Sequence, residues 1–472
     1  MSQETLLLIF VILAGCYMAW NIGANDVANA MGTSVGSGAL TLRQAVVIAA
    51  VLEFSGAFFL GSHVSETIQK GIVDSTIFTD PLTLVYGMLS ALLAAGVWLQ
   101  IASYYGWPVS TTHSIVGAVV GFGMVVGGLE AIYWDNVAFI ASSWIVSPFI
   151  GGAISFVIFN FLRRKIFYAS NPVQAAKRIT PTLVFCVVFI LSLIMLYKGL
   201  SNVELELTFL QSLGISAGCG LIGSIISKIC LRYLTTKSVA DTTPSEYHPE
   251  VSSQLEKARR HLQKVAEASR GPIQFQTSEL LDEVQLLSES LKKKEKSGQE
   301  SAEYALVEKI FGYLQIMSAC LMAFAHGAND VANAIGPLSA SITVLTTGVI
   351  SSQATVPTWA LALGGIGIVV GLATWGWRVI ETIGKKITEL TPTRGFAAEF
   401  GAAVTILFAS RLGLPVSTTH ILVGSVIGVG LARGIEALDL RTTRFIFISW
   451  LVTVPAGAGV AIAFFYLIKA VF

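Results

Sequence analysis

Charged residues are scarce in this sequence. Of its 472 residues, 12% are Asp, Glu, Lys or Arg and 54% are hydrophobic, whereas a soluble globular protein carries about 25% charged residues. The 30 basic and 29 acidic side chains leave a net charge of +1, which gives no excess of positive charge for a nucleic acid. The composition excludes a water-soluble fold, argues against a nucleic-acid partner and predicts a chain embedded in a lipid bilayer.

Sequence motifs for nucleotide hydrolysis and metal catalysis are also missing. The chain has no GxxxxGK[ST] phosphate loop, so ATP-driven transport by this chain alone is not expected. It has no HExxH sequence, and its five cysteines lack CxxC spacing. No catalytic residue and no cofactor is predicted. A membrane-embedded enzyme acting on a phosphorylated lipid stays open as an alternative, although it would need a nucleophile or metal set gathered in one place.

Long apolar runs fill most of the chain. About twelve of them approach the ~20 residues that a helix needs to cross a membrane, which predicts an all-α membrane protein. One polar segment interrupts them, with 11 Lys/Arg and 13 Asp/Glu between Lys237 and Lys309. Apolar residues recur there at helical spacing on both sides of Gly271 and Pro272. Residues 232–306 are therefore predicted to be an insert of amphipathic helices.

Basic residues predict the orientation in the membrane, because Lys and Arg collect in short cytoplasmic loops. Three basic clusters fall on one side if the N-terminus begins on the other. We therefore expect both termini outside the plasma (inner) membrane and the insert in the cytoplasm. The clusters are Arg163, Arg164, Lys165, Lys177 and Arg178; Lys385, Lys386 and Arg394; and Arg433, Arg441 and Arg444.

Two short motifs each occur twice. GANDVANA spans Gly23 to Ala30 and again Gly327 to Ala334, while PVSTTH spans Pro108 to His113 and again Pro415 to His420. The copies keep the same order and are offset by 304 and 307 residues. This repetition indicates a duplication within the chain.

The duplication predicts the domain organisation. Residues 1–165 form a first repeat of about five spans, 166–231 add two linking spans, and 307–472 form a second repeat of about five spans. The second repeat would then enter the membrane from the opposite face. Two inverted repeats with broken or re-entrant helices at the midplane are the architecture of many secondary transporters.

GANDVANA brings an acid and two amides to the end of an apolar span. Such groups are costly in hydrocarbon without partners, so we expect them to face a protein-lined, wet cavity. Its glycines permit backbone that is not regular helix, and a broken helix is expected there. Capping of a helix end is the structural alternative, but the duplication favours a substrate or ion site. The residues are Asn25, Asp26 and Asn29, with Asn329, Asp330 and Asn333 in the second copy.

PVSTTH has the chemistry of an anion cradle. Its proline suits a helix start, and the residues after it offer hydroxyls together with the free N–H groups of a helix N-terminus, where the dipole favours an anion. The ligand predicted from these groups is an oxyanion. The motif's histidines, His113 and His420, could equally stabilise a loop or relay protons. The hydroxyl residues are Ser110, Thr111 and Thr112, with Ser417, Thr418 and Thr419 in the second copy.

None of the four motif copies contains Lys or Arg. A doubly charged oxyanion near Asp26 and Asp330 would be repelled by several kcal/mol, since like charges a few ångströms apart interact strongly in a poorly solvated site. A cation must therefore bind alongside, with Asp26 and Asp330 as sodium ligands or proton acceptors. Glu53 and Glu399 are two further acids in apolar spans. Each is a cation or proton site, or else pairs with a polar neighbour or lies near the interface.

At these motifs the chain resembles the inorganic phosphate transporter (PiT) family of cation-coupled phosphate symporters. The likeness extends through Gly23 to Gly71 and Gly384 to Gly430, and it covers both repeats, about 330 residues. The resemblance implies a phosphate site between the repeats with sodium ions nearby. It also implies a homodimer.

The sequence thus predicts a secondary active symporter that imports inorganic phosphate with sodium or protons. The six hydroxyl residues of PVSTTH, with Asn25 and Asn329, would bind phosphate. The cation ligands would be Asn29 and Asn333 together with Asp26, Asp330, Glu53 and Glu399. The alternatives left open are a permease for sulfate or another tetrahedral oxyanion, and a passive channel.

Overall fold

In the part of the chain that it describes, the computed structural model consists of helices joined by loops, with one isolated β-bridge between Val73 and Ile132. The basic residues Lys385 and Lys386 and the proline Pro108, used in the sequence analysis, lie outside the described residues. The described residues are 3–74, 77–78, 80–107, 109–197, 207–233, 250–295, 299–350, 355–377, 390–434 and 440–472.

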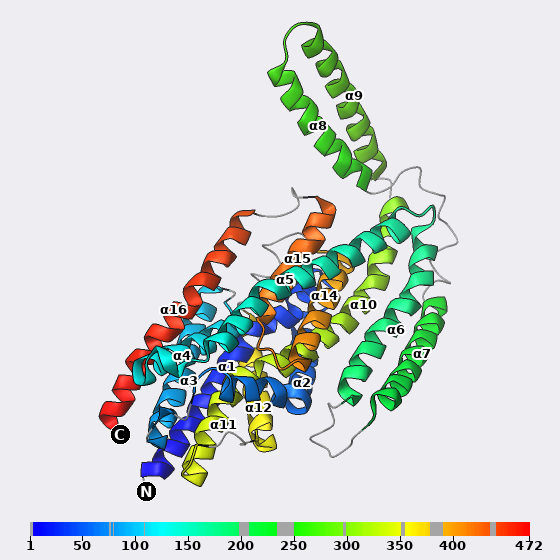
Figure 1. Cartoon of the computed structure of the whole chain (residues 1–472). Coiled ribbons are helices and arrows are strands. Elements are labelled where there is room, and N and C mark those ends of the chain that lie inside the picture. The colour runs from blue at the N-terminus through cyan, green and yellow to red at the C-terminus, as the bar shows by residue number, and fades with distance from the viewer. Residues whose placement is uncertain are drawn as a thin grey trace. The chain divides into compact units, whose positions relative to one another are not determined.

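The helices divide into two compact units, each described here by itself. The larger unit comprises Met1–Asn160, Val184–Gly223 and Gly312–Phe472, and the smaller comprises Phe161–Leu183 and Ser224–Phe311. Figure 1 shows the helices in chain order from blue to red. They are α1 (Gln3–Gly36), α2 (Leu42–Lys70), α3 (Pro81–Tyr105), α4 (Thr111–Gly127), α5 (Trp134–Leu162), α6 (Pro172–Leu196), α7 (Phe209–Tyr233), α8 (Glu250–Ala268), α9 (Pro272–Glu295), α10 (Gln299–Asp330), α11 (Ala332–Thr347), α12 (Thr358–Thr374), α14 (Pro392–Arg411), α15 (Thr418–Arg433) and α16 (Leu440–Val471).

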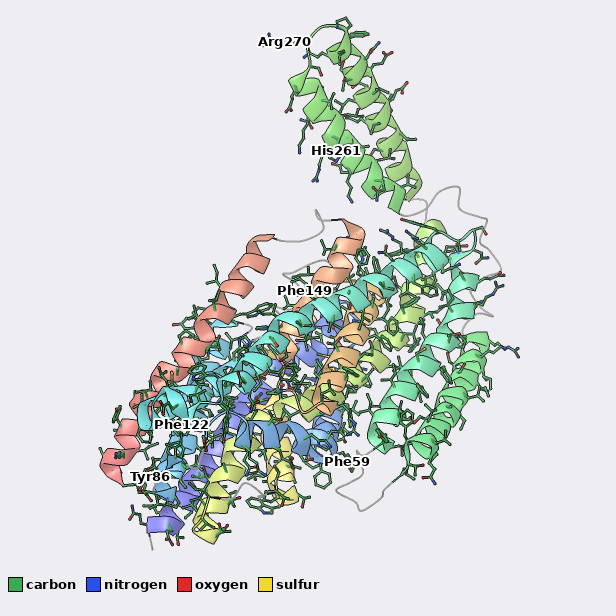
Figure 2. All side chains as sticks on the ribbon, in the orientation of Figure 1. Phe59, Tyr86, Phe122, Phe149, His261 and Arg270 are labelled. Atoms are coloured by element: carbon green, nitrogen blue, oxygen red, sulfur yellow. The ribbon has the colours of Figure 1, made fainter. Side chains whose placement is uncertain are left out.

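Eight helices in the described part of the chain are long and apolar enough to cross a membrane, and three shorter apolar helices, α4, α12 and α15, accompany them. The chain is therefore an all-α, multi-pass membrane protein. Large apolar side chains also face outward from these helices. Phe149 of α5 is 75% exposed, whereas Phe122 of α4 is fully buried. Both residues are labelled in Figure 2. An exposed apolar helix face of this kind suits contact with lipid.

In the smaller unit, α8 and α9 form an antiparallel helical hairpin (Figure 1). The chain reverses at Gly271, whose φ of +67° favours glycine, and α9 begins at Pro272, where a missing N–H costs nothing. His261 lies on α8 and Arg270 at the turn (Figure 2). These are two helices at the positions that the periodicity of the insert indicates.

The first GANDVANA copy lies inside a continuous helix, so the expectation of a broken helix there is wrong. Its glycine serves close helix packing instead. A Cβ built on Gly23 of α1 would lie 1.9 Å from the carbonyl oxygen of Ile368 on α12. In the second copy, a Cβ on Gly327 would lie 2.0 Å from the carbonyl oxygen of Glu53 on α2. That copy is interrupted only at Val331, whose φ of −56° and ψ of −30° are still helical.

The two PVSTTH copies do lie where the chain leaves regular helix. Each ends a loop and begins a short helix, α4 or α15. Ser110 is the N-cap of α4 and Ser417 the N-cap of α15. Pro415 therefore precedes the N-cap by two residues and is not the first helical residue that the sequence suggested. Both short helices direct their N-terminal N–H groups into the interior of the larger unit, because their first residues are buried.

Candidate functional site

The duplicated motifs meet inside the larger unit, where each GANDVANA copy contacts the PVSTTH copy of the other half. Asn29 Nδ2 donates a hydrogen bond to Thr419 Oγ1 at 2.7 Å. In the reciprocal contact, Asn333 Nδ2 donates to Thr111 Oγ1 and Thr112 Oγ1, both at 3.2 Å. Side chains some hundreds of residues apart in sequence thus form one buried cluster.

The remaining motif amides hold the loops that lead into the short helices. The amide of Asn25 contacts Ser103 Oγ, near the end of α3, at 3.0 Å. Asn329 Nδ2 donates to Ser410 Oγ at 2.9 Å and to the carbonyl of Leu414 at 3.1 Å. The two amides therefore link each GANDVANA helix to the approach of the PVSTTH copy in its own half.

The two motif aspartates are fully buried and bonded to the amide and hydroxyl groups around them. Asp26 Oδ1 accepts from Asn29 Nδ2 at 3.0 Å, and Asp330 Oδ2 accepts from Thr418 Oγ1 at 2.7 Å. Acids and hydroxyls from both halves thus share one buried site. No Lys or Arg takes part in these described contacts.

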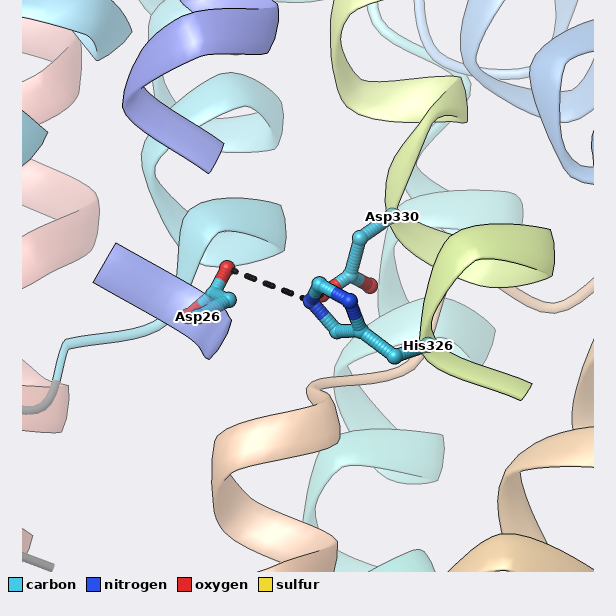
Figure 3. Close-up of side chains that lie close together, drawn as sticks. All are labelled: Asp26, His326 and Asp330. Carbon is cyan, nitrogen blue, oxygen red and sulfur yellow. Dashed lines mark ion pairs between the residues drawn. The ribbon is translucent and has the colours of Figure 1, made fainter. Parts of the chain in front are cut away.

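A histidine that the sequence analysis missed lies between the acids. His326 Nε2 is 3.0 Å from Asp330 Oδ2 and 4.0 Å from Asp26 Oδ2, and its Nδ1 is 3.3 Å from Glu53 Oε1. Figure 3 shows the ring between the two aspartates. The picture of a cluster without any basic side chain was therefore incomplete. The sequence does contain one indication of this role: His326 directly precedes Gly327 and lies one helical turn before Asp330, so the two side chains are neighbours on the helix.

Several buried oxygens of the cluster lack a hydrogen-bond donor among the described groups. Carboxylate and amide oxygens without donors are costly in a buried site unless a cation or an unplaced donor approaches them. Hard oxygen ligands of this kind suit an alkali or alkaline-earth cation. These oxygens are Asp26 Oδ2, Asp330 Oδ1, Glu53 Oε2, Asn329 Oδ1 and Asn333 Oδ1.

The serines of PVSTTH act as helix caps. Ser110 Oγ accepts from the backbone N–H of His113, and Ser417 Oγ accepts from that of His420, each at 3.2 Å. A capping hydroxyl keeps its own O–H to donate. Capping and ligand binding can therefore coexist at these residues.

Glu399 lies in a different polar cluster, on α14. Its Oε1 accepts from the hydroxyls of Thr33 and Ser34, the latter at 2.5 Å. Its Oε2 accepts from Ser318 Oγ at 2.6 Å, and Gln315 Nε2 is 3.4 Å from Oε1. The carboxyl group is fully buried. Neutral hydroxyl and amide groups thus surround Glu399, and no basic side chain contacts it among the described residues.

Buried ionisable side chains within apolar helices are rare in membrane proteins and mark the paths of substrates and ions. The fold and the site therefore define a membrane transporter. The chain belongs to the phosphate transporter family, which residues 22–461 match.

Two similar proteins agree with this membership. The chain is 48% identical over 458 residues to "Inorganic phosphate transporter 2-1, chloroplastic" of Arabidopsis thaliana, covering 96% of this chain and 70% of that protein. It is also similar to a solved structure described as "The sodium-dependent phosphate transporter", with a TM-score of 0.79 and 37% identity over 99% of this chain and 100% of that one.

These findings confirm the resemblance drawn from the two motifs. The chain transports phosphate and is not an enzyme, so the alternative of a lipid-modifying enzyme falls away. The sulfate alternative is not favoured either.

Proposed function

We propose that the chain imports inorganic phosphate together with sodium, and that the buried cluster of the four motif copies is where both bind. The observation that supports this most is the reciprocal bonding of Asn29 with Thr419 and of Asn333 with Thr112. It gathers two acids and both hydroxyl sets in one buried site. A divalent anion would be strongly repelled there unless cations bound with it.

Phosphate would bind to the hydroxyls and the helix N-termini of the two PVSTTH copies. Each N-terminus contributes about half a positive charge, which offsets only part of the charge of a divalent anion. Asn25 and Asn329 would donate to phosphate from the GANDVANA copies by exchanging one of their present hydrogen bonds to the loops. The hydroxyl residues are Ser110, Thr111 and Thr112, with Ser417, Thr418 and Thr419. Thr112, Thr418 and Thr419 donate to Val416, Asp330 and Val109 in this structure and would turn from these acceptors to bind phosphate.

Sodium would bind on the acidic side of the cluster, to Asp26 and Asp330 and to the amide oxygens of Asn29 and Asn333. The donor-free carboxylate oxygens support this assignment. Glu53 would add negative charge to the same region through its contact with His326. Glu399, with its hydroxyl and amide neighbours, would form a separate cation site.

The architecture proposed for this chain is a pair of inverted repeats, 1–165 and 307–472, with about twelve spans in total. The linking spans would be 166–231 and the insert 232–306 would be cytoplasmic, with both termini outside the plasma (inner) membrane. The crossed contacts between the halves support an inverted pair, since each half completes the site of the other. The functional unit would be a homodimer.

Uptake of labelled phosphate into proteoliposomes tests this function. An imposed sodium gradient should drive accumulation above equilibrium, whereas a proton gradient alone should not. Arsenate should compete and sulfate should not, because phosphate keeps a proton near neutral pH and can donate it to an acceptor such as Asp26. Accumulation with a proton gradient but without sodium would show that protons are the coupling ion. Equilibration without accumulation would indicate a channel.

A further inference from the structure

The two PVSTTH segments are hydrogen-bonded directly to each other. Thr112 Oγ1 donates to the carbonyl oxygen of Val416 at 3.0 Å, and Thr419 Oγ1 donates to the carbonyl oxygen of Val109 at 3.3 Å. A backbone carbonyl of each copy thus accepts a hydrogen bond from a hydroxyl of the other. The distance between the two hydroxyl sets therefore depends on the contacts between the two copies.

Four aromatic rings lie in a row beside these segments, and we call them the ring row: Trp144, His113, His420 and Trp450. The ring centroids of Trp144 and His113 are 3.9 Å apart, those of the two histidines 4.3 Å, and those of His420 and Trp450 3.5 Å. All four side chains are at most 9% exposed. The row joins α5, α4, α15 and α16 in one continuous contact.

Trp144 contacts both motif copies. Its ring packs on His113 of the first copy, while its indole Nε1 donates to the carbonyl oxygen of Pro415 in the second at 2.9 Å. The helix that carries it is held tightly. A Cβ built on Gly424 of α15 would lie 2.3 Å from the carbonyl oxygen of Pro148 on α5. A ring on a closely packed helix has little freedom to shift.

Simple packing does not account for the two histidines. Both ring nitrogens of His113 and Nε2 of His420 are buried and have no hydrogen-bond partner within normal geometry among the described residues. Unsatisfied buried nitrogens cost free energy, and apolar rings of similar size would avoid that cost. Each histidine directly follows the hydroxyl residues of its motif. The separation of the two imidazoles is therefore coupled to the separation of the two hydroxyl sets.

We propose that the ring row sets the gap between the two hydroxyl sets and so selects the size of the tetrahedral oxyanion that binds. This inference rests on the proposed function, in which those hydroxyls hold the anion. Hydrogen bonds weaken steeply away from their preferred distance, so a fixed gap favours an anion of one size. Trp144 and the two histidines are then positioning residues that act on the ligand through the hydroxyls.

Arsenate is the probe that isolates size, because it has the shape and charge of phosphate but longer bonds to oxygen. Sodium-driven phosphate uptake is measured with and without arsenate for the wild type and for Trp144→Phe, which removes the indole donor and keeps a ring. Loss of one hydrogen bond should raise the KM for phosphate about 5-fold. The inhibition constant of arsenate should change less than about 2-fold and kcat should stay nearly constant.

Trp134→Phe is the matched control. Trp134 lies at the start of the same helix, is 46% exposed, and its Nε1 also donates to a backbone carbonyl, that of Leu129, at 2.8 Å. It contacts neither PVSTTH copy among the described interactions. The control should keep the wild-type KM and the wild-type preference for phosphate over arsenate.

A second measurement separates positioning from folding. His113→Leu and His420→Leu should each raise the KM for phosphate, and the double variant should be within about 2-fold of either single one, because both break the same contact. Variants are compared only as monodisperse protein with the thermal midpoint recorded. Wild-type selectivity in folded Trp144→Phe, or multiplicative effects of the histidine changes, would overturn the role of the ring row. Failure of the wild type to accumulate phosphate would instead overturn the proposed function.

Discussion

The two halves of the chain match in their motifs but differ in the side chains around them. The asparagine and threonine contacts are reciprocal between the halves. His326, however, corresponds to Ile22 by the 304-residue offset of GANDVANA. Both residues are fully buried. The position that holds an imidazole among carboxylates in the second half thus holds an apolar side chain in the first.

Two acids outside the motifs, Glu53 and Glu399, also have no acidic counterpart in the other half. Glu53 contacts Gly327 through its carbonyl, and the residue that contacts Gly23 in the same way is Ile368. Glu399 corresponds to Leu92 by the 307-residue offset of PVSTTH. The shared hydroxyl residues would bind the tetrahedral anion and the shared aspartates the cations, whereas the unmatched ionisable groups would add to the cation side in one half only. The following predictions test this division.

The largest effect is expected at the motif aspartates, which occur in both halves. Asp26→Asn and Asp330→Asn should each reduce sodium-driven phosphate uptake by about 100-fold or more, because loss of a buried charge partner costs about 3 kcal/mol or more. Uptake into proteoliposomes measures this, with equal amounts of reconstituted protein as the control. Near-normal uptake by both variants would remove the aspartates from the cation site.

The next effect concerns the unmatched His326. His326→Ile gives the second half the residue type of Ile22, but leaves Glu53 and Asp330 buried without their basic neighbour. We expect a loss of about 3 kcal/mol in stability, the cost of breaking a buried ion pair. Unfolding of the purified protein in detergent should show it.

A double variant sharpens that prediction. His326→Ile with Glu53→Ile removes both partners, and it should recover part of the stability that His326→Ile loses, since no unpaired Glu53 carboxylate stays behind. Strictly additive losses would mean that the two side chains do not interact energetically.

A smaller effect is expected at Glu399. Glu399→Gln keeps the size of the side chain and lets the neighbouring hydroxyls rotate to suit the new amide, but it removes the charge. The sodium concentration for half-maximal uptake should rise about 10-fold, equivalent to about 1.4 kcal/mol, while the KM for phosphate at saturating sodium changes little. An unchanged sodium dependence would exclude Glu399 as a cation ligand.

The smallest effects compare the two halves directly. Asn29→Ala and Asn333→Ala each remove hydrogen bonds that position hydroxyls of the other half, the groups proposed to hold phosphate. At saturating sodium, each variant should raise the KM for phosphate by about 5-fold, as expected for about 1 kcal/mol. Similar effects in the two variants would support equivalent roles for the halves in binding the anion. A rise in the KM for phosphate in only one of the two variants would show that the halves contribute unequally to anion binding.

Much of the site could be predicted from sequence because its residues are short-range patterns. Asp26, Asn29 and their copies stand out as polar groups in apolar spans, and the hydroxyls after the prolines indicate a helix N-terminus. Ser110 and Ser417 are indeed N-caps. His326 escaped attention because a single histidine carries no pattern of its own, and its contacts with Glu53 depend on how α10 packs on α2.

The helix through the first GANDVANA copy shows why local reasoning fell short. Glycine permits irregular backbone, but it also permits close approach of two helices, and only the packing of α1 on α12 distinguishes these uses. The carbonyl of Ile368 lies where a Cβ of Gly23 would be. The α-helix therefore continues, and the glycine is explained by its neighbour.

Composition and repetition alone determined that this chain lies in a membrane, that it contains a duplicated site, and that the site combines acids with hydroxyl groups. These properties are local, since hydropathy and motif chemistry are carried by adjacent residues. Only the tertiary structure decided that Asn29 meets Thr419, that His326 lies among three acids, and that Trp144 joins both PVSTTH copies. Such contacts join residues far apart in the chain, so they follow from the packing of whole helices.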